Sequence, residues 1–258
     1  MRVRLPKFIS RAGLSSRRTA EDWIREGRVT VNGRVVRDPG TPVDPDADHV
    51  KVDGRLIGSG PSHIYLLLHK PRGVVTTLRD PEGRPTVADL IKGVKARLFP
   101  VGRLDFQTEG LLLLTNDGEL AHRLMHPRYG LERVYRVKVK GIPTRDVLQG
   151  LLRGIQIEPG LRVRAQAKFI RALKANAWLE MTLKEGRHRE IRRMCEAVGY
   201  PVLALRRVRF GPLTLEGLPP GRYRALTVEE IRGLQRSVGR LETRHRRRGY
   251  LDIPKDAG

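Results

Sequence analysis

The sequence predicts an α+β protein in which a small αβ unit precedes a larger domain on a mixed, mostly antiparallel sheet. The first 61 residues combine a helix pattern with two hairpin turns, and a Gly/Ser/Pro segment follows them. The longer remainder alternates strand and helix patterns around an uninterrupted apolar run, Leu111 to Leu114, which is typical of a strand buried on both faces. We therefore expect domains at residues 1–61 and 62–236 and a basic tail at residues 237–258.

Length and charge limit the classes of partner. A chain of 258 residues with 39% hydrophobic content can bury a core, and its formal net charge of +23 predicts a polyanionic partner. The apolar runs are too short to cross a membrane, which favours nucleic acid. No apolar signal segment follows Met1, and the single cysteine, Cys195, permits neither an internal disulfide nor a thiolate metal cage. Together these features predict a cytoplasmic protein.

The amide content suggests a hypothesis about the source. The chain has 40 arginines among its 51 basic residues, but only three asparagines and five glutamines. Few thermolabile amides are typical of thermophilic proteins. An arginine bias is equally expected from a GC-rich genome, so a thermal melt is needed to decide.

The N-terminal unit begins with a helix pattern over Ser15 to Gly27, with serine in the cap region and glycine as the stop. Two hairpins follow, because Asn32-Gly33 and Asp53-Gly54 are strong turn signals between short valine-rich strands. The basic residues of this unit are expected on one positive face, which by itself fits a solvated surface as well as a binding surface. They are Arg11, Arg17, Arg18, Arg25, Arg28 and Arg34.

The second domain opens with a buried-strand pattern from Ile64, a Lys-Pro-Arg-Gly turn at residues 70–73 and another short strand. A short helix is expected around residues 87–91. After the apolar run, Asn116-Asp-Gly caps a helix through Met125. His122 and His126 are four residues apart there, but no third ligand lies nearby in the sequence, which argues against a metal site.

A strand over Leu131 to Lys140 follows, and its alternation puts Tyr135 on the same face as Val137 and Val139, so the ring points inward. A Thr-capped helix at residues 144–152 and two strands near residues 162–170 and 178–183 come next. The last strand expected is basic, over residues 202–210. A capping box, Thr227 to Glu230, begins the final helix.

The segment Lys184 to Met194 leads from a strand into a strongly basic helix. Helical spacing places Ile191, Met194 and Cys195 inward, while Arg189, Arg192 and Arg193 occupy the other sides. Such a helix is expected to bind an anion.

The stretch Val101 to Gly118, VGRLDFQTEGLLLLTNDG, carries the clearest candidate site. One carboxylate, Asp105, lies between Arg103 and a Gly-bounded turn at the edge of the apolar run. By spacing alone, an aspartate in this position is most simply a turn residue. Taken whole, however, the stretch resembles the catalytic motif of pseudouridine synthases of the RsuA/RluB-like family, which modify ribosomal RNA. Residues 8–18 and 27–33 likewise resemble the αL-type RNA-binding module of ribosomal and RNA-modifying proteins.

The resemblance implies roles for individual residues. Asp105 is the expected catalytic residue, either as nucleophile at the ribose anomeric carbon or as base for the neighbouring sugar proton. Arg192 is expected to pair with Asp105 and keep it ionised, and Tyr135 to lie against the target base. The remaining expected substrate contacts are Arg103, Leu183, Lys70, Arg72 and Arg189. For Lys70 and Arg72 a structural turn is an equal alternative, and Arg103 is expected to support the turn or the displaced RNA strand. The family commonly has Gln where this chain has Glu190, which leaves the role of that side chain open.

The implied activity is isomerisation of a uridine in ribosomal RNA, in a cleft across the sheet that contains Asp105, without metal, nucleotide or redox cofactor. The expected partner is ribosomal RNA or a pre-ribosomal particle, and the protein is expected to be a monomer. A large-subunit site is the first choice and a small-subunit site the second. A non-catalytic assembly factor would share the charge and the N-terminal module. An RNA hydrolase or methyltransferase would need metal ligands or a nucleotide loop that the sequence does not contain.

Overall fold

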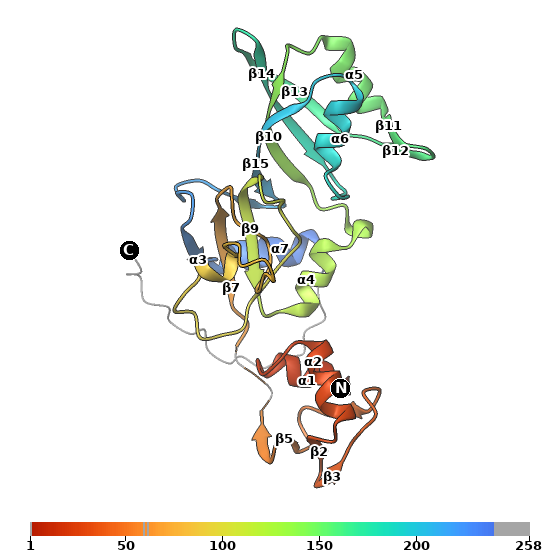
Figure 1. Cartoon of the computed structure of the whole chain (residues 1–258), viewed down its shortest axis with the longest axis vertical. Helices are drawn as coiled ribbons and strands as arrows, with labels where there is room; N and C mark the ends of the chain where they lie inside the picture. The colour runs from red at the N-terminus through yellow and green to blue at the C-terminus, as the bar shows by residue number, and fades with distance from the viewer. Residues whose placement is uncertain (1, 59, 61, 240–258) are drawn as a thin grey trace. The chain divides into compact units, whose positions relative to one another are not determined.

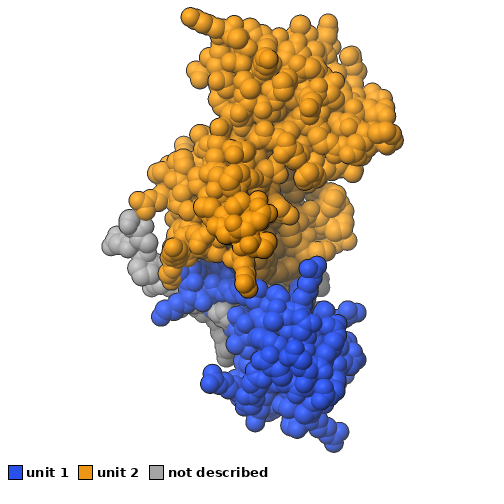
Figure 2. All heavy atoms as spheres, in the orientation of Figure 1, with its two compact units in different colours: residues 1–64, 94–98, 246–258 blue, residues 65–93, 99–245 orange. Residues whose placement is uncertain are grey.

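The structure is a computed structural model that describes residues 2–58, 60 and 62–239. The described chain divides into two compact units, residues 2–64 with 94–98, and residues 65–93 with 99–239 (Figure 2). Nearly all of the expected basic tail, from residue 240 onward, lies outside the described residues. No described helix is long and apolar enough to cross a membrane.

The first unit contains two helices, α1 (Leu5–Arg11) and α2 (Arg17–Arg25). A four-stranded sheet has the order β3 (Arg34–Val35), β2 (Val29–Val31), β5 (Val50–Val52), β6 (Arg55–Ile57), and β1 (Val3–Arg4) pairs with β4 (Pro42–Val43). Helix α1 was not expected from the sequence. Apolar side chains of both helices and of β2, β4 and β5 form one core, which includes Leu5, Ile9, Ala20, Ile24, Val29 and Val50.

Local sequence signals explain these elements. Ser16 caps α2 by accepting a hydrogen bond from Thr19 N at 3.0 Å, and the chain leaves the helix at Gly27, where φ is +78°. Both hairpin turns have two successive residues with positive φ, at Asn32-Gly33 and Asp53-Gly54. Those angles are the ones that Asn-Gly and Asp-Gly adopt with least strain. The predicted helix and both predicted hairpins are therefore confirmed.

The second unit is built on a nine-stranded sheet (Figure 1). Its main order is β13 (Gln166–Ala172), β14 (Asn176–Leu183), β10 (Arg133–Lys140), β15 (Val202–Phe210), β9 (Glu109–Thr115), β7 (Tyr65–Lys70), β17 (Tyr223–Ala225). Short strands β8 (Phe99–Pro100) and β16 (Leu213–Thr214) pair with β9 and β15. A separate ribbon joins β11 (Ile155–Glu158) and β12 (Leu161–Val163). Only the β9–β15 pair is parallel among the strand pairs described, which confirms a mixed, mostly antiparallel sheet.

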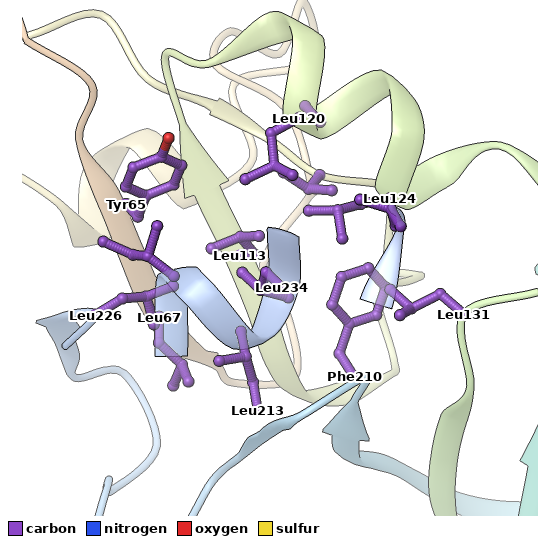
Figure 3. Close-up of a cluster of buried hydrophobic side chains, with 14 of the residues drawn as sticks. Tyr65, Leu67, Leu113, Leu120, Leu124, Leu131, Phe210, Leu213, Leu226 and Leu234 are labelled. Carbon is purple, nitrogen blue, oxygen red and sulfur yellow. The ribbon is translucent and has the colours of Figure 1, made fainter. Parts of the chain in front are cut away.

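Helices pack on the two halves of this sheet and create two cores. Helices α4 (Gly118–Met125) and α7 (Val228–Ser237) cover the β7–β9 half, where Leu67, Leu113, Leu120 and Leu234 meet (Figure 3). Helices α5 (Arg145–Arg153) and α6 (Glu190–Ala197) cover one face of β10 and β14 (Figure 1). The smaller helices are α3 (Val87–Leu90) and the 3-10 turn η1 (Pro127–Tyr129).

Three sequence expectations differ from the structure in detail. The strand expected over residues 162–170 is broken, because β12 ends at Val163 and β13 begins at Gln166. The strand at residues 202–210 is not the last, since β16 and β17 follow it. The basic helix begins only at Glu190, because Arg189 adopts a left-handed conformation with φ +49° and holds the chain in a loop up to that point.

Candidate active site

Asp105 lies in the loop between β8 and β9, at the edge of the buried half of the sheet. Its carbonyl accepts a hydrogen bond from Thr108 N at 2.9 Å, which closes a tight turn over residues 105–108. The turn follows Gly102, where φ is +80°. The side chain of Asp105 is 34% exposed, so the carboxylate is available to a ligand while its backbone is fixed.

The Lys-Pro-Arg-Gly segment after β7 holds this loop in place. Gly73 N donates to Phe106 O at 2.9 Å, on one side of Asp105. On the other side, the buried hydroxyl of Thr76 donates to Leu104 O at 2.6 Å and accepts from Leu104 N at 3.2 Å. These bonds bracket Asp105, so segments separated by about thirty residues in the sequence form one rigid support.

Lys70 also stabilises the turn at residues 105–108. Its side chain is fully buried, and Nζ donates to Pro71 O and Thr108 O, both at 2.9 Å. Burial lowers the pKa of Lys70 to about 8, although Asp105 and Glu109 oppose this shift. The expected RNA contact is therefore wrong for Lys70, because its ammonium group is enclosed by the protein; the structural alternative is the correct one.

Arg192, on the first turns of α6, approaches the carboxylate from the other half of the sheet. Its Nε lies 3.9 Å from Asp105 Oδ2, and its side chain is only 15% exposed. Burial lowers the pKa of the Arg192 guanidinium, the neighbouring Arg189 lowers it further, and Asp105 acts in the opposite direction. The structure thus brings together Asp105 and Arg192, 87 residues apart in the sequence, as expected.

Two buried polar atoms near Asp105 have no hydrogen-bond partner within the described part of the chain. They are Nε of Arg192 and Oγ1 of Thr108. Native proteins satisfy nearly all buried polar groups, so an unsatisfied one calls for a partner, such as a water molecule, an ion or a ligand. Both atoms belong to residues that flank Asp105, and no other atom of the described residues shares this property.

Tyr135 lies on β10, between Met181 of β14 and Arg207 of β15. Its face is the one that packs against α6, since it adjoins the core that contains Met181, Leu183 and Ile191. Arg207 in turn pairs with Gly110, so Tyr135 is two strands, roughly 10 Å, from the start of β9. The ring is partly buried beside the site, and Leu183 is buried in the same core.

Gly110 and Arg207, which were not expected from the sequence as functional residues, join the two halves of the sheet. At Gly110, φ is +126°, and a Cβ atom would lie 2.3 Å from Arg207 O. Arg207 is buried, donates from Nε to Leu111 O at 2.7 Å, and places its guanidinium on the ring of Phe210. The sequence signal for this junction is Gly110 itself, because a glycine within a strand often marks a place where another backbone approaches closely.

The rim around Asp105 is basic. Arg72, Arg103 and Arg189 are exposed, and none has an ion pair within the described residues. Phe106, next to Asp105, is 39% exposed and was not singled out from the sequence, because single apolar residues in loops are common. The carboxylate is therefore surrounded by groups suited to phosphates and to a base.

Glu190 has a structural role at the start of α6. It is buried at the N-terminus of α6, and its carboxylate accepts from Arg187 N at 2.9 Å. Burial raises the pKa of Glu190. The side chain closes the turn that positions α6, and a glutamine amide oxygen would accept the same hydrogen bond.

The other polar candidates on this unit do not form a metal site or a reactive thiol. Among the residues described, no group of three or more His, Cys, Asp or Glu side chains could hold a metal ion, and His122 and His126 instead stack edge to face. Cys195 is buried, which raises the pKa of its thiol to about 12. A thiol with this pKa stays protonated and unreactive at neutral pH.

The arginines of the N-terminal unit fall into two groups. Arg28 makes a two-point contact with Asp53, at 2.9 and 2.7 Å, and stacks on Trp23, while Arg25 pairs with Asp22 and Glu21. The Asp53 contact raises the pKa of Arg28. These two side chains are therefore engaged within the unit. Arg17, Arg18 and Arg34 are exposed and have no ion pair in the part of the chain described, whereas Arg11 is half-buried.

Known protein families and relatives match both parts of the chain. Residues 64–197 match the family described as RNA pseudouridylate synthase, and residues 3–49 match the S4 domain. The chain is 44% identical to ribosomal large subunit pseudouridine synthase B of Bacillus subtilis, over 90% of this chain and 95% of the relative. It is 45% identical to an uncharacterized RNA pseudouridine synthase of Aquifex aeolicus, over 93% and 96% of the two chains. A crystal structure of a pseudouridylate synthase superimposes with a TM-score of 0.64 at 30% identity, covering 90% of this chain and 99% of the other.

Proposed function

The chain belongs to the RNA pseudouridylate synthase family and carries an N-terminal S4 domain, and we propose that it isomerises one uridine of large-subunit ribosomal RNA, with Asp105 as its catalytic residue. The observation that supports the residue assignment is the bracketed carboxylate of Asp105 beside the buried Arg192, at 3.9 Å. Relatives named for the large subunit, from Bacillus subtilis and Pseudomonas aeruginosa, support the choice of substrate.

The reaction moves one bond and keeps the composition of the nucleotide. The N1–C1′ bond of uridine breaks, the uracil turns, and C5 bonds to C1′; the C5 proton leaves and N1 ends protonated. A base that is stacked and paired is out of reach of Asp105, so the uridine must leave the helix, at a cost of a few kcal/mol. Phosphate contacts with the exposed Arg72, Arg103 and Arg189 offset that cost.

Asp105 acts on the sugar in this proposal, either by bonding to C1′ or by removing the C2′ proton. Arg192 places its positive charge beside this carboxylate, with Nε 3.9 Å from Oδ2. The ring of Tyr135 supports the flipped uracil from the α6 face of the sheet, with Leu183 behind it. Lys70, Gly73 and Thr76 position the turn and do not touch the substrate.

The S4 domain supplies affinity in this scheme. Arg17, Arg18 and Arg34 remain free of internal ion pairs among the described residues and are suited to phosphate contacts, which carry little sequence information. We further propose that the protein works in the bacterial cytoplasm as a monomer on free ribosomal RNA or a pre-ribosomal particle. A thermophilic source is consistent with the few amide side chains.

The decisive experiment is tritium release from [5-³H]uridine in unmodified large-subunit and small-subunit ribosomal RNA, with wild type and Asp105→Asn side by side. We expect release by the wild type from the large-subunit RNA only. Asp105→Asn should release none while keeping its RNA affinity, since one carboxylate does not contribute to a phosphate-binding surface. Release by the variant would remove Asp105 from its role, and tight binding of the wild type without release from either RNA would favour a non-catalytic assembly factor.

A further inference from the structure

On strands β13, β14, β10 and β15, one face of the sheet is covered by no described helix. Directly opposed residues on antiparallel strands point to the same side, and neighbours along a strand point to opposite sides. Tyr135, Val137 and Leu179 face the helices α5 and α6, so Arg136, Lys138 and Trp178 face the other way. We call this surface, on strands β13, β14, β10 and β15, the open face.

Register places Trp178 at the centre of a basic row on the open face. Trp178 on β14 pairs with Lys138 on β10 and with Arg171 on β13. The indole is partly exposed, and it makes no ring or cation–π contact within the described residues. One aromatic residue is therefore flanked on both sides by a basic residue, each on a neighbouring strand whose backbone lies about 5 Å away.

The next row adds three more cations and one acid. Lys168, Glu180, Arg136 and Arg206 lie opposite one another across the four strands. Arg136 pairs with Glu180 at 3.4 Å, and Arg206 pairs with Glu109 at 2.7 Å. Within the residues that the structure describes, Lys138, Lys168 and Arg171 have no carboxylate in ion-pair range, so the charge next to Trp178 is not neutralised.

The surface beside this row is hollowed. Lys168, Glu180 and Thr182, with Val134 and Arg209, line a hollow of about 450 Å³. Charge and shape together therefore describe a shallow, positive platform with a flat ring in it. A surface that binds a membrane would need a larger apolar area. A surface that binds an acidic protein would need only the positive charge and not the partly exposed indole ring of Trp178.

We propose that the open face is a second RNA-binding surface, on which Trp178 stacks on a base of single-stranded RNA while Lys138 and Arg171 contact its phosphates. A base inside a duplex is already stacked, so only an unpaired segment offers the indole a free face. Because the open face lies on the opposite side of the sheet from Tyr135, the RNA on it is a segment that flanks the target and not the target itself. The proposal rests on the RNA substrate class proposed above.

Tryptophan fluorescence tests the proposal directly, because the chain has only two tryptophans. In a Trp23→Phe protein, Trp178 is the sole indole. The probe is a 12-nucleotide oligoadenylate, which contains no uridine and so cannot be isomerised. We expect saturable quenching of Trp178 by the single strand and none by the same strand paired with oligothymidylate, which also contains no uridine. No saturable quenching would overturn the proposal, and equal quenching by the duplex would do the same.

A charge-matched pair of variants identifies the surface. Lys138→Ala/Arg171→Ala should weaken oligoadenylate binding roughly tenfold and lower the slope of log affinity against log salt by about 1.4, the value for two phosphate contacts on a single strand. Arg145→Ala/Arg153→Ala removes the same charge from the exposed surface of α5 and should change binding little. An equal loss in both variants would mean general attraction and would refute the surface.

Turnover separates this proposal from the proposed function. Trp178→Ala, followed by anisotropy of labelled RNA, should also bind about tenfold more weakly, while tritium release from saturating RNA stays at the wild-type rate. Should the wild type release no tritium, the proposed function fails, but the quenching of Trp178 by oligoadenylate still decides the proposal made here.

Discussion

Replacing Gly110 by alanine should separate the two halves of the active site. The parallel junction of β9 and β15 rests on two residue pairs, Arg206 with Glu109 and Arg207 with Gly110. An alanine Cβ would lie 2.3 Å from Arg207 O and 2.5 Å from Arg207 N, where real Cβ contacts stay above 3.0 Å. The two backbones must therefore move apart by about 0.7 Å or more, because backbone atoms cannot rotate away.

The expected loss of stability has two parts. A non-glycine residue at φ +126° costs about 1–3 kcal/mol, and forcing an extra carbon into a packed junction costs about 1–3 kcal/mol more. The free energy of unfolding should therefore fall by about 2–6 kcal/mol. Gly160→Ala is the matched control, since Gly160 has φ +75° but nothing within 4 Å of its Cβ position, so only the conformational cost applies.

Gly110→Ala should also lower the rate of catalysis. Asp105 lies in the loop before β9, and Tyr135 lies on β10, on the other side of β15, so separating β9 from β15 moves the two residues apart. A displacement near 1 Å at a catalytic group costs about a hundredfold in rate. Urea unfolding at 25 °C measures the stability, and tritium release at the same temperature measures the rate. If Gly110→Ala loses no more stability than Gly160→Ala and keeps full turnover, the junction does not assemble the site.

Three further predictions concern Arg192, Lys70 and the S4 domain. Arg192→Lys keeps the charge but replaces the planar group, so kcat should fall about a hundredfold with KM nearly unchanged, measured by tritium release; an unchanged kcat would argue against directed contact with Asp105. The pKa of Lys70 is about 8 in the folded protein, against 10.5 for a free lysine. Between pH 8 and pH 10.5 the unfolded chain therefore binds one more proton than the folded protein. The free energy of unfolding should rise with pH over this range, by up to about 3 kcal/mol. Urea unfolding from pH 7.5 to 10.5 should show that rise in the wild type and a smaller one in Lys70→Met; parallel curves would contradict the assignment. Deleting residues 1–60 should weaken rRNA binding and its salt dependence in filter-binding assays, and an unchanged salt slope would leave the S4 domain without a binding role.

Local chemistry made much of the fold predictable. The hairpins at Asn32-Gly33 and Asp53-Gly54 follow from the few residues that accept positive φ, and the capping box at Thr227 follows from hydrogen bonds three residues apart. Helix α1 was missed because it is seven residues long, has no side-chain cap and derives its stability from the core around Leu5 and Ile9. The interruption between β12 and β13 was missed because the residues around it continue a strand-like pattern.

The candidate site was predictable only where a motif carried it. Asp105, Arg192 and Tyr135 were named through the family resemblance, and the structure brings the first two within 3.9 Å. Lys70 was expected to contact RNA because the family resemblance places a Lys-Pro-x-Gly segment near the active site, with a structural turn as the alternative. Only the tertiary structure shows that Lys70 is buried and donates to Thr108 O. Glu190 likewise became interpretable only once its carboxylate was seen to accept from Arg187 N.

The sequence by itself determined the two-part organisation, the strong positive charge and the motif that contains Asp105, because these depend on composition, short-range geometry and a contiguous run of residues. The tertiary structure decided how the two halves of the sheet are joined. Strand order, the parallel junction at Gly110 and Arg207, and the basic row around Trp178 depend on pairings between segments far apart in the sequence, up to 159 residues for Ala225 and Leu66. Such pairings are set by the packing of the whole core, because a local pattern fixes which face of a strand is buried but not which distant strand lies beside it.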